Sequence, residues 1–360
     1  ELNRLYPNEN EKIEKVVIRK GRENYLCLLN FEEAIRNSGP GRSSIALGIL
    51  ARWISSSRDG DIVSGDFPAW LSDLFGREYT VNLADKRGEC IYSACTHYRR
   101  CFIEIAENKA KNAELVIANH ALVMSRAGMV MGNNKPPSQY VFDEGHHLFD
   151  AADSAFATNL SGHETSEMRR WIRGTESQQP RGTRGLRQRI SDLISQNEEA
   201  TKSLTKASHA ATVLPAHAWL ERIEKNEPMG PIENFLTEAR KHILGRQIKA
   251  ERAYTLQCDT SSPSKALILA SCKAAESLDQ LIMSLGLLEQ YLVELLNIQC
   301  EQPNAHNFAR TQAVHCALKR HYDTISMWYA MLKSIGNSPT TAFVDWFEIT
   351  RDSSKIIDIG

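Results

Sequence analysis

The sequence predicts an α/β core fragment with parallel strands, a small α-helical domain that carries clustered cysteines, and a large all-helical insertion. Three observations predict this arrangement: short apolar runs in the first 150 residues, three cysteines within residues 90–101, and long amphipathic patterns over residues 151–340. Apolar runs of about four to eight residues are typical of buried parallel strands, whereas apolar residues spaced three and four apart indicate helices.

The composition is that of an ordinary globular protein: 360 residues, 42% hydrophobic and 24% charged, with a formal net charge of −1. With so little net charge, nucleic acid must be bound by local patches. No run of about 18 apolar residues occurs, so we expect no transmembrane helix and no membrane partner. The polar, acidic start without a Met indicates no signal peptide and suggests a segment of a longer protein. Eight cysteines are too few for a disulfide scaffold, which favours a reducing compartment.

The first 150 residues alternate short strand and helix signals. Between the two later strands lies a stretch long enough for a crossover, so we expect a βαβ-like element. The expected strands are residues 16–18, 115–119 ("LVIAN") and 140–144 ("YVFDE"), and the expected helices are residues 44–57, 67–76 and 102–114.

Residues 151–340 give no strand signal and read as an all-helical insertion after a strand. Turn-like breaks rich in Pro, Gly and Ser separate its amphipathic segments. Residues 341–360 regain an alternating β pattern, so we expect the chain to return there to the sheet that it left. The expected helical segments are residues 186–209, 212–226, 232–254, 264–298 and 304–335.

Four cysteines, Cys27, Cys90, Cys95 and Cys101, are separated by 62, 4 and 5 residues. Four thiolates suit tetrahedral zinc or an iron–sulfur cluster, and the loose gaps suit a cluster better because it is wider than one ion. The alternative is a chance grouping of buried thiols. Polar neighbours around the last three favour ligands. For the other cysteines, Cys258, Cys272, Cys300 and Cys316, we expect helical positions packed in the core.

The run "YVFDEGHH" ends an expected strand with Asp143 and Glu144. At the carboxyl edge of a parallel sheet, such an Asp can hold Mg²⁺ and a neighbouring Glu can polarise an attacking water. The two carboxylates can equally cap the next helix. A phosphate-binding loop of the type G-x-x-x-x-G-K-S/T is needed for nucleotide hydrolysis, and the sequence contains no Gly-Lys dipeptide.

Together, these residues resemble the iron–sulfur superfamily 2 DNA helicases of the XPD and DinG group, and the bacterial DinG type most of all. The resemblance covers residues 16–150 and rests on "KGRENYLC", the C-x4-C-x5-C spacing, "CFIEIAENKAKNAELVIANHALV" and "VFDEGHHL" in this order. It implies that Cys27, Cys90, Cys95 and Cys101 ligate a [4Fe–4S] cluster. It also implies that Asp143, which would hold Mg²⁺ with ATP, and Glu144 form a Walker B pair, and that His146 ends the DEAH-like box, in which Gly145 replaces Ala.

The resemblance implies a division of the chain into parts of a helicase. Residues 1–26 and 106–150 would belong to the first motor domain, residues 27–105 to an iron–sulfur domain, residues 151–340 to a helical arch, and residues 341–360 to the motor domain again. The whole protein would couple ATP hydrolysis to 5′-to-3′ translocation on single-stranded DNA, and the duplex would split at an iron–sulfur wedge, in DNA repair or replication. Without a phosphate-binding loop, this segment alone is expected to be inactive.

Basic and aromatic residues beside the cysteines, Tyr98, Arg99 and Arg100, are candidates for DNA contact, since cations bind phosphates and rings stack on bases. A second candidate is the basic stretch with Arg169, Arg170 and Arg173, which we interpret more readily as a solvated helix face. Two alternatives to a helicase stand beside it: a non-catalytic DNA-binding module with iron–sulfur or zinc, and, far less well supported, an iron–sulfur nuclease of the RecB type.

The expected partners are ATP, single-stranded DNA, and forked or R-loop nucleic acid. The resemblance further implies a bacterial cytoplasmic protein, and we expect a monomer.

Overall fold

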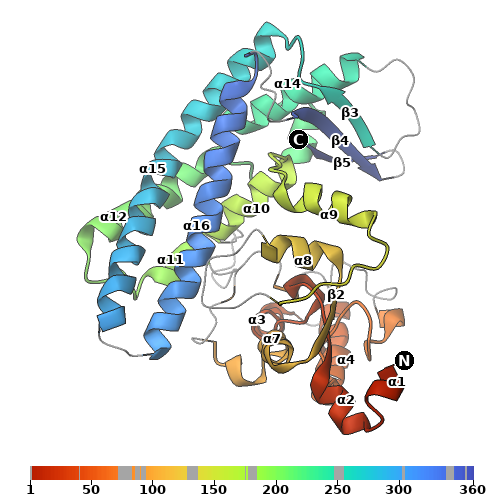
Figure 1. Cartoon of the computed structure of the whole chain (residues 1–360). Coiled ribbons are helices and arrows are strands. Elements are labelled where there is room, and N and C mark those ends of the chain that lie inside the picture. Colours follow the sequence, from red (N-terminus) through yellow and green to blue (C-terminus); the bar gives the residue numbers. More distant parts are fainter. Residues whose placement is uncertain are drawn as a thin grey trace. The chain divides into compact units, whose positions relative to one another are not determined.

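The computed structural model describes residues 2–39, 41–71, 83–85, 90, 95–127, 137–174, 176, 185–246, 255–301, 305–337, 344–352 and 355–360. The chain divides into two compact units, unit 1 (Glu1–Ala157) and unit 2 (Thr158–Gly360) (Figure 1). The predicted helix over residues 67–76 lies mostly outside the described residues, with only residues 69–71 in helical conformation.

Unit 1 combines short helices with two parallel strands. Its elements are α1 (Leu2–Leu5), α2 (Glu9–Lys15), β1 (Val16–Arg19), the 3₁₀ turn η1 (Arg22–Asn24), α3 (Leu28–Asn37), α4 (Arg42–Ser56), the 3₁₀ turn η3 (Tyr98–Arg100), α7 (Phe102–Asn112), β2 (Leu115–Ala118), α8 (His120–Ala127) and α9 (His147–Phe156). The strands predicted at residues 16–18 and 115–119, and the helices predicted at 44–57 and 102–114, are therefore confirmed.

β1 and β2 pair in parallel, with Val16 opposite Leu115 and Arg19 opposite Ala118. The burial predicted for the second of these strands is wrong, because every residue of β2 is exposed. The strand predicted at residues 140–144 is also wrong: these residues are extended or bent, Val141 is 97% exposed, and no described strand pairs with them. An apolar run becomes a strand only when a neighbour satisfies its backbone groups. The βαβ element was thus misplaced, since the parallel partner of β2 is β1.

The core of unit 1 is small and lies under α3 and α4. Its buried side chains are Leu26, Phe31, Leu47, Leu50, Trp53, Ile62, Phe67, Leu71, Leu83 and Ala84, with Phe102 packed against them. Trp53 and Phe67 meet edge to face at 5.0 Å between ring centroids. Because Leu26 and Phe102 adjoin Cys27 and Cys101, this core holds the backbone of both cysteines in place.

Unit 2 is mainly helical. Its elements are α10 (Gly162–Arg173), α11 (Leu186–Ile190), α12 (Glu198–Ala210), the 3₁₀ turn η4 (Ala211–Val213), α13 (Trp219–Glu224), α14 (Gly230–Arg246), β3 (Thr255–Asp259), α15 (Lys265–Glu301), α16 (Ala305–Ser334), β4 (Trp346–Asp352) and β5 (Lys355–Ile359). Side-chain caps begin two of these helices: Ser161 accepts a hydrogen bond from the Glu164 amide at 3.2 Å, and Asn197 accepts one from the Ala200 amide at 2.9 Å.

The long helices α15 and α16 lie side by side and confirm the predictions for residues 264–298 and 304–335 (Figure 1). One stripe of α15 is fully buried, with Leu278, Leu281, Leu285, Leu288 and Leu292 at 0% exposure. By length and composition, Lys265–Cys300 could cross a membrane, a test that core helices of soluble proteins also pass. The packed leucine stripe is what a core helix of a globular unit requires.

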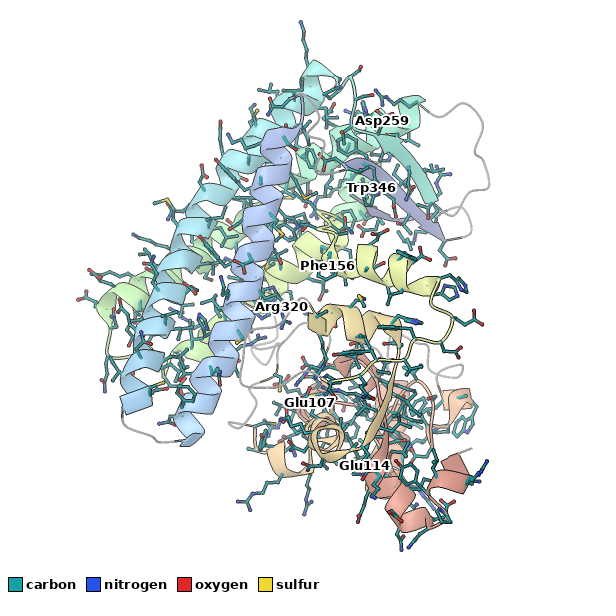
Figure 2. All side chains as sticks on the ribbon, viewed as in Figure 1. Glu107, Glu114, Phe156, Asp259, Arg320 and Trp346 are labelled. Atoms are coloured by element: carbon teal, nitrogen blue, oxygen red, sulfur yellow. The ribbon has the colours of Figure 1, made fainter. Side chains whose placement is uncertain are left out.

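The insertion is not all-helical. β3 begins at Thr255, directly after the predicted helix of residues 232–254, and pairs antiparallel with β4, which pairs with β5. Asp259 and Trp346, labelled in Figure 2, are partners in the β3–β4 register. The tail therefore does not return to the sheet of β1 and β2; it forms a separate sheet within unit 2. The alternating burial of β3 spans only five residues, too short a pattern for a confident strand prediction.

The four remaining cysteines are not uniformly packed in the core. Cys258 lies on β3 and is half-buried, as is Cys272 on α15, but Cys300 and Cys316 are exposed. The predicted burial of Cys300 and Cys316 is therefore wrong, and so is the predicted helical position of Cys258. The helical positions predicted for Cys272, Cys300 and Cys316 are confirmed.

Candidate iron–sulfur and nucleic-acid site

Cys27 is positioned by backbone hydrogen bonds to two distant segments. The Leu26 amide donates to the Gly60 carbonyl at 2.9 Å, and the Cys27 amide donates to the Leu83 carbonyl at 2.8 Å. Cys27 is the N-cap residue of α3, but its side chain makes no capping hydrogen bond. Burial raises the pKa of the Cys27 thiol to about 12, although the backbone amides of Asn30 and Leu29 act to lower it. The thiol is therefore protonated near neutral pH unless a metal binds it.

Cys101 has the same local setting at a second helix. It is the N-cap residue of α7, and its side chain likewise makes no capping hydrogen bond. Burial raises the pKa of this thiol as well. The next residue, Phe102, packs against Gly60, where a Cβ atom would lie 2.2 Å from the ring. Gly60 has φ +66°, so only glycine suits this contact, which helps to place the start of α7.

All four predicted ligands line one cavity. Cys27, Cys90, Cys95 and Cys101 are half-buried and form no disulfide in the part of the chain that the structure describes, and the cavity wall also includes Asp85, His97, Tyr98 and Glu104. Cys27 and Cys101 each stand at the N-terminus of a helix. Among the described residues, no three His, Cys, Asp or Glu side chains are placed to hold one metal ion. The four thiols thus share one cavity with the side chains of Asp85, His97 and Glu104.

A network of charges lies beneath the cavity. Asp85, which is 5% exposed, pairs with Arg22 at 3.0 Å, and Arg22 also lies 3.9 Å from Glu104 and 3.7 Å from Glu107. Glu107, labelled in Figure 2, accepts a hydrogen bond from Arg19 at 2.7 Å. The network joins α7, which begins at a cysteine, to the end of β1. Carboxylates buried this deeply need cationic partners, and Arg22 and Arg19 supply them.

The predicted DNA-contacting residues occupy the turn between Cys95 and Cys101. Arg99 and Arg100 are exposed, and neither has a carboxylate within ion-pair distance among the described residues. Tyr98 is 37% exposed and lines the cysteine cavity. The neighbouring His97 lies 2.8 Å from Glu32 of α3, which ties the turn to that helix. Two unpaired arginines therefore stand on a fixed turn at the rim of the cysteine cavity.

The arginines of the second basic stretch are used inside unit 2. Arg169 donates to the carbonyls of Thr212 at 2.7 Å and Leu214 at 2.6 Å, and it pairs with Glu176. Arg173 pairs with Glu176 and donates to the Ser208 carbonyl at 2.6 Å. These contacts connect α10 to the end of α12, so Arg169 and Arg173 are structural and not free for phosphate.

The predicted ATP-site residues lie together but are open to solvent. Glu144 has φ +49°, its amide donates to Asp143 Oδ1 at 3.1 Å, and its carboxylate lies 3.4 Å from His146 Nδ1. The side chains of Glu144 and His146 are 69% and 66% exposed. Asp143 and Glu144 do not follow a strand in this structure, so the expected carboxyl edge of a sheet is not formed at this point.

Sequence reasoning missed two carboxylates of the cavity wall, Asp85 and Glu104. Glu104 lies three residues after Cys101, about one helical turn. A helix predicted to begin at Cys101 would therefore have placed Glu104 on the same face as the cysteine. Burial, then Glu107, raises the pKa of Glu104. Asp85 has no local signal: it reaches the cavity only because residues 83–85 lie beside Leu26 and Cys27.

No protein-family model matches the chain. Individual relatives do match. The chain is 28% identical over 160 residues to the ATP-dependent DNA helicase YoaA of Haemophilus influenzae, covering 43% of this chain and 24% of that protein. It is 29% identical over 197 residues to YoaA of Escherichia coli, covering 51% and 29%.

It is also 30% identical over 177 residues to the ATP-dependent DNA helicase DinG of Photobacterium profundum, covering 46% of this chain and 25% of that protein. The chain thus spans about a quarter of the length of the relatives that it matches. The predicted resemblance is confirmed, since the chain is similar over about half its length to bacterial proteins named ATP-dependent DNA helicase YoaA and DinG.

Proposed function

We propose that the chain is part of an ATP-dependent DNA helicase that translocates 5′ to 3′ on single-stranded DNA and carries a [4Fe–4S] cluster on Cys27, Cys90, Cys95 and Cys101. The observation that carries the proposal is the convergence of these four thiols on one cavity, although 62 residues lie between Cys27 and Cys90. Similarity to proteins named as helicases supports the proposed activity, and the shared cavity supports the proposed cluster site.

The residues present fit an iron–sulfur cluster. When bound, the cluster would cross-link α3, α7 and the intervening segment through four sulfurs, and would contribute folding energy to unit 1. The chain's own contribution is to hold Cys27 and Cys101 at the N-termini of α3 and α7, where burial raises the pKa of both thiols, so a bound metal group would be needed to keep them deprotonated. Arg22 offsets the charge of Asp85 and Glu104, which would otherwise repel a cluster with four thiolates.

For ATP, the proposal assigns Asp143 to Mg²⁺, Glu144 to the attacking water and His146 to the link between nucleotide and DNA. These roles rest on the resemblance of "DEGH" to the helicase box. Because the chain contains no Gly-Lys dipeptide, the phosphate-binding loop must be supplied by other residues of a parent protein. In that protein, Glu144→Gln should keep nucleotide affinity and lower hydrolysis by orders of magnitude. Turnover near that of the unmodified enzyme would remove Glu144 from the site.

For DNA, Arg99 and Arg100 are proposed to bind phosphates of the single strand, with Tyr98 as a stacking ring. The two arginines are the exposed cations nearest the cysteine cavity that lack an acidic partner among the described residues. A strand bound here would pass beside the cluster, where the proposed wedge splits the duplex. Forked DNA and R-loops are the proposed substrates, in DNA repair or replication in a bacterial cytoplasm.

The cluster is tested by anaerobic purification of the chain, followed by iron, acid-labile sulfide and zinc assays. We expect a brown protein with about four irons and four sulfides per chain, the composition of one [4Fe–4S] cluster. Cys101→Ser should lose the iron, and Cys300→Ser, which changes an exposed cysteine of unit 2, should keep it. The second candidate function is a zinc-bearing DNA-binding module, which would need no phosphate-binding loop. A colourless protein with one zinc per chain would support this second candidate.

A further inference from the structure

A side-chain contact joins the turn between Cys95 and Cys101 to helix α3. His97 Nε2 lies 2.8 Å from Glu32 Oε2. Glu32 is on the second turn of α3, the helix whose N-cap residue is Cys27, and His97 lines the cavity together with the three cysteines. The contact therefore links the segment that follows Cys27 to a turn 65 residues further along the chain.

Both partners of this contact are held by other bonds. Glu32 pairs through Oε1 with Arg36, one turn further along α3, so its second oxygen is directed to His97. On the other side, the His97 carbonyl accepts a hydrogen bond from the Arg100 amide at 2.9 Å, which closes the turn. A bond between two partners that are already held loses less conformational entropy on forming than one between free side chains.

The contact supports a part of the site that the other interactions leave to it. Cys27 is held by its amide bond to the Leu83 carbonyl, and the residue after Cys101, Phe102, packs against the core of unit 1. Cys95 lies two residues before His97. The bond between His97 and Glu32 uses no sulfur, and Glu32 is not part of the cavity wall, so the contact can form whether or not a metal group is bound.

We propose that His97 and Glu32 are a positioning pair that holds the turn with Cys95 against α3 and so slows loss of the metal group from the cysteine cavity. The inference rests on the proposed cluster and adds two residues that are not ligands. A cluster held by four sulfurs becomes open to chelators when one ligand segment moves away. Partners outside the ligand set that orient the ligands lower the population of such an open state.

The test measures how fast iron leaves the anaerobically purified chain. Bathophenanthroline disulfonate is added, and both its coloured iron complex and the visible absorption of the cluster are followed. When opening of the turn is a fast pre-equilibrium, the rate of loss follows the population of the open state. The side chains of His97 and Glu32 are 32% and 34% exposed, so the pair is partly screened by water. His97→Phe should then lose iron about two- to fivefold faster, the range for an exposed ion pair.

The double variant separates positioning from general destabilisation. Glu32→Ala should match His97→Phe, because Glu32 acts on the cavity only through His97. The double variant of both should lose iron no faster than either single one, because the same contact is already absent. Two independent destabilising changes would instead multiply their effects.

Two controls complete the test. His97→Gln keeps a side-chain N–H donor for Glu32 and should restore a rate close to that of the unmodified chain. His315 Nε2 lies 2.9 Å from Glu289 Oε1, a second histidine–glutamate contact, which joins α15 and α16 in unit 2. His315→Phe removes that contact and should lose iron at the unmodified rate.

The outcomes separate the pair from the cluster. An unmodified chain without iron and sulfide overturns the proposed cluster, and with it the role of the pair in holding one. In an iron-loaded chain, release at the unmodified rate in Glu32→Ala or in His97→Phe overturns the pair and leaves the cluster standing, as does a double variant with multiplied effects or a failure of His97→Gln to restore the rate. If a single variant loads too little iron to follow, hydrogen exchange of a peptide covering residues 95–101 decides: faster exchange than in His315→Phe supports the pair, and equal exchange overturns it.

Discussion

The two units of this chain are stabilised in different ways. Unit 2 buries a long stripe of leucines on α15 against α12, α14 and α16, with exposures of 0%. Unit 1 has a small apolar core and relies on buried charges, among them Asp61, Asp85 and Arg19. Apolar packing depends little on pH or ligands, whereas buried charges and thiols depend on both. The residues that carry the proposed chemistry are all in unit 1, the unit with the conditional stability.

The largest expected effect comes from a cavity in the core of unit 2. Leu285→Ala should lower the free energy of unfolding of this unit by about 2–5 kcal/mol, because a fully buried side chain is lost. Leu287, two residues further along the same helix, is 54% exposed. Leu287→Ala should change the free energy of unfolding by less than about 0.5 kcal/mol. Urea unfolding followed by hydrogen exchange of peptides from α15 and α16 measures both. Equal effects would contradict the assignment of the buried face.

A smaller effect is expected from the charges of unit 1, and it should depend on pH. Asp61 accepts hydrogen bonds from the amides of Val63 at 2.9 Å and Ser64 at 3.1 Å, and it pairs with Lys20. Burial by itself would raise the pKa of Asp61, but Lys20 and the amides outweigh it, so this pKa lies below its ordinary value. Because the folded pKa is the lower one, Asp61 stabilises the fold above about pH 4, the unfolded value, and this contribution is lost as pH falls further.

Asp61→Asn should therefore cost about 1–3 kcal/mol near neutral pH and flatten the acid dependence of unit 1. Asp153 is an exposed carboxylate of α9 and serves as the control. Asp153→Asn should change neither the stability of unit 1 near neutral pH nor its dependence on acid. Hydrogen exchange of peptides from residues 16–71 at several pH values reports on unit 1 separately from unit 2. An acid dependence that survives in Asp61→Asn would place the responsible carboxylate elsewhere in unit 1.

The smallest effect on stability, and the one most specific to function, is expected at Arg99 and Arg100. Replacing both with Ala should leave unfolding unchanged but weaken binding of a single strand and flatten the plot of log affinity against log salt by about 0.7 per lost phosphate contact. Tyr98→Ala should shift that plot in parallel, by about 1–3 kcal/mol for a lost stacking ring. Fluorescence anisotropy of a labelled strand, on protein that retains its iron, measures both.

Arg187, an exposed arginine of α11 in unit 2, is the matched control. Arg187→Ala should keep both the affinity and the salt slope. If Arg187→Ala weakens binding and the double variant of Arg99 and Arg100 does not, the DNA path follows unit 2 and the proposed functional difference between the units is reversed.

Local patterns in the sequence determined the long helices, the first two strands and the identity of the cysteine set. α15 and α16 follow from apolar residues at helical spacing, because a helix forms its hydrogen bonds within itself and its pattern is local. The spacing of Cys90, Cys95 and Cys101 predicted ligands for the same reason: close neighbours in sequence remain close in the fold.

Only the tertiary structure decided which distant segments meet. Backbone hydrogen bonds from Leu26 to Gly60 and from Cys27 to Leu83 place Cys27 at the cavity. Asp85, two residues after Leu83, lines the same cavity. Likewise, residues 255–259 form strand β3 because β4 pairs with them. The run YVFDE, residues 140–144, lies outside every strand that the structure describes. Strands need partners from elsewhere in the chain, so a local apolar run predicts the capacity to pair but not the pairing itself.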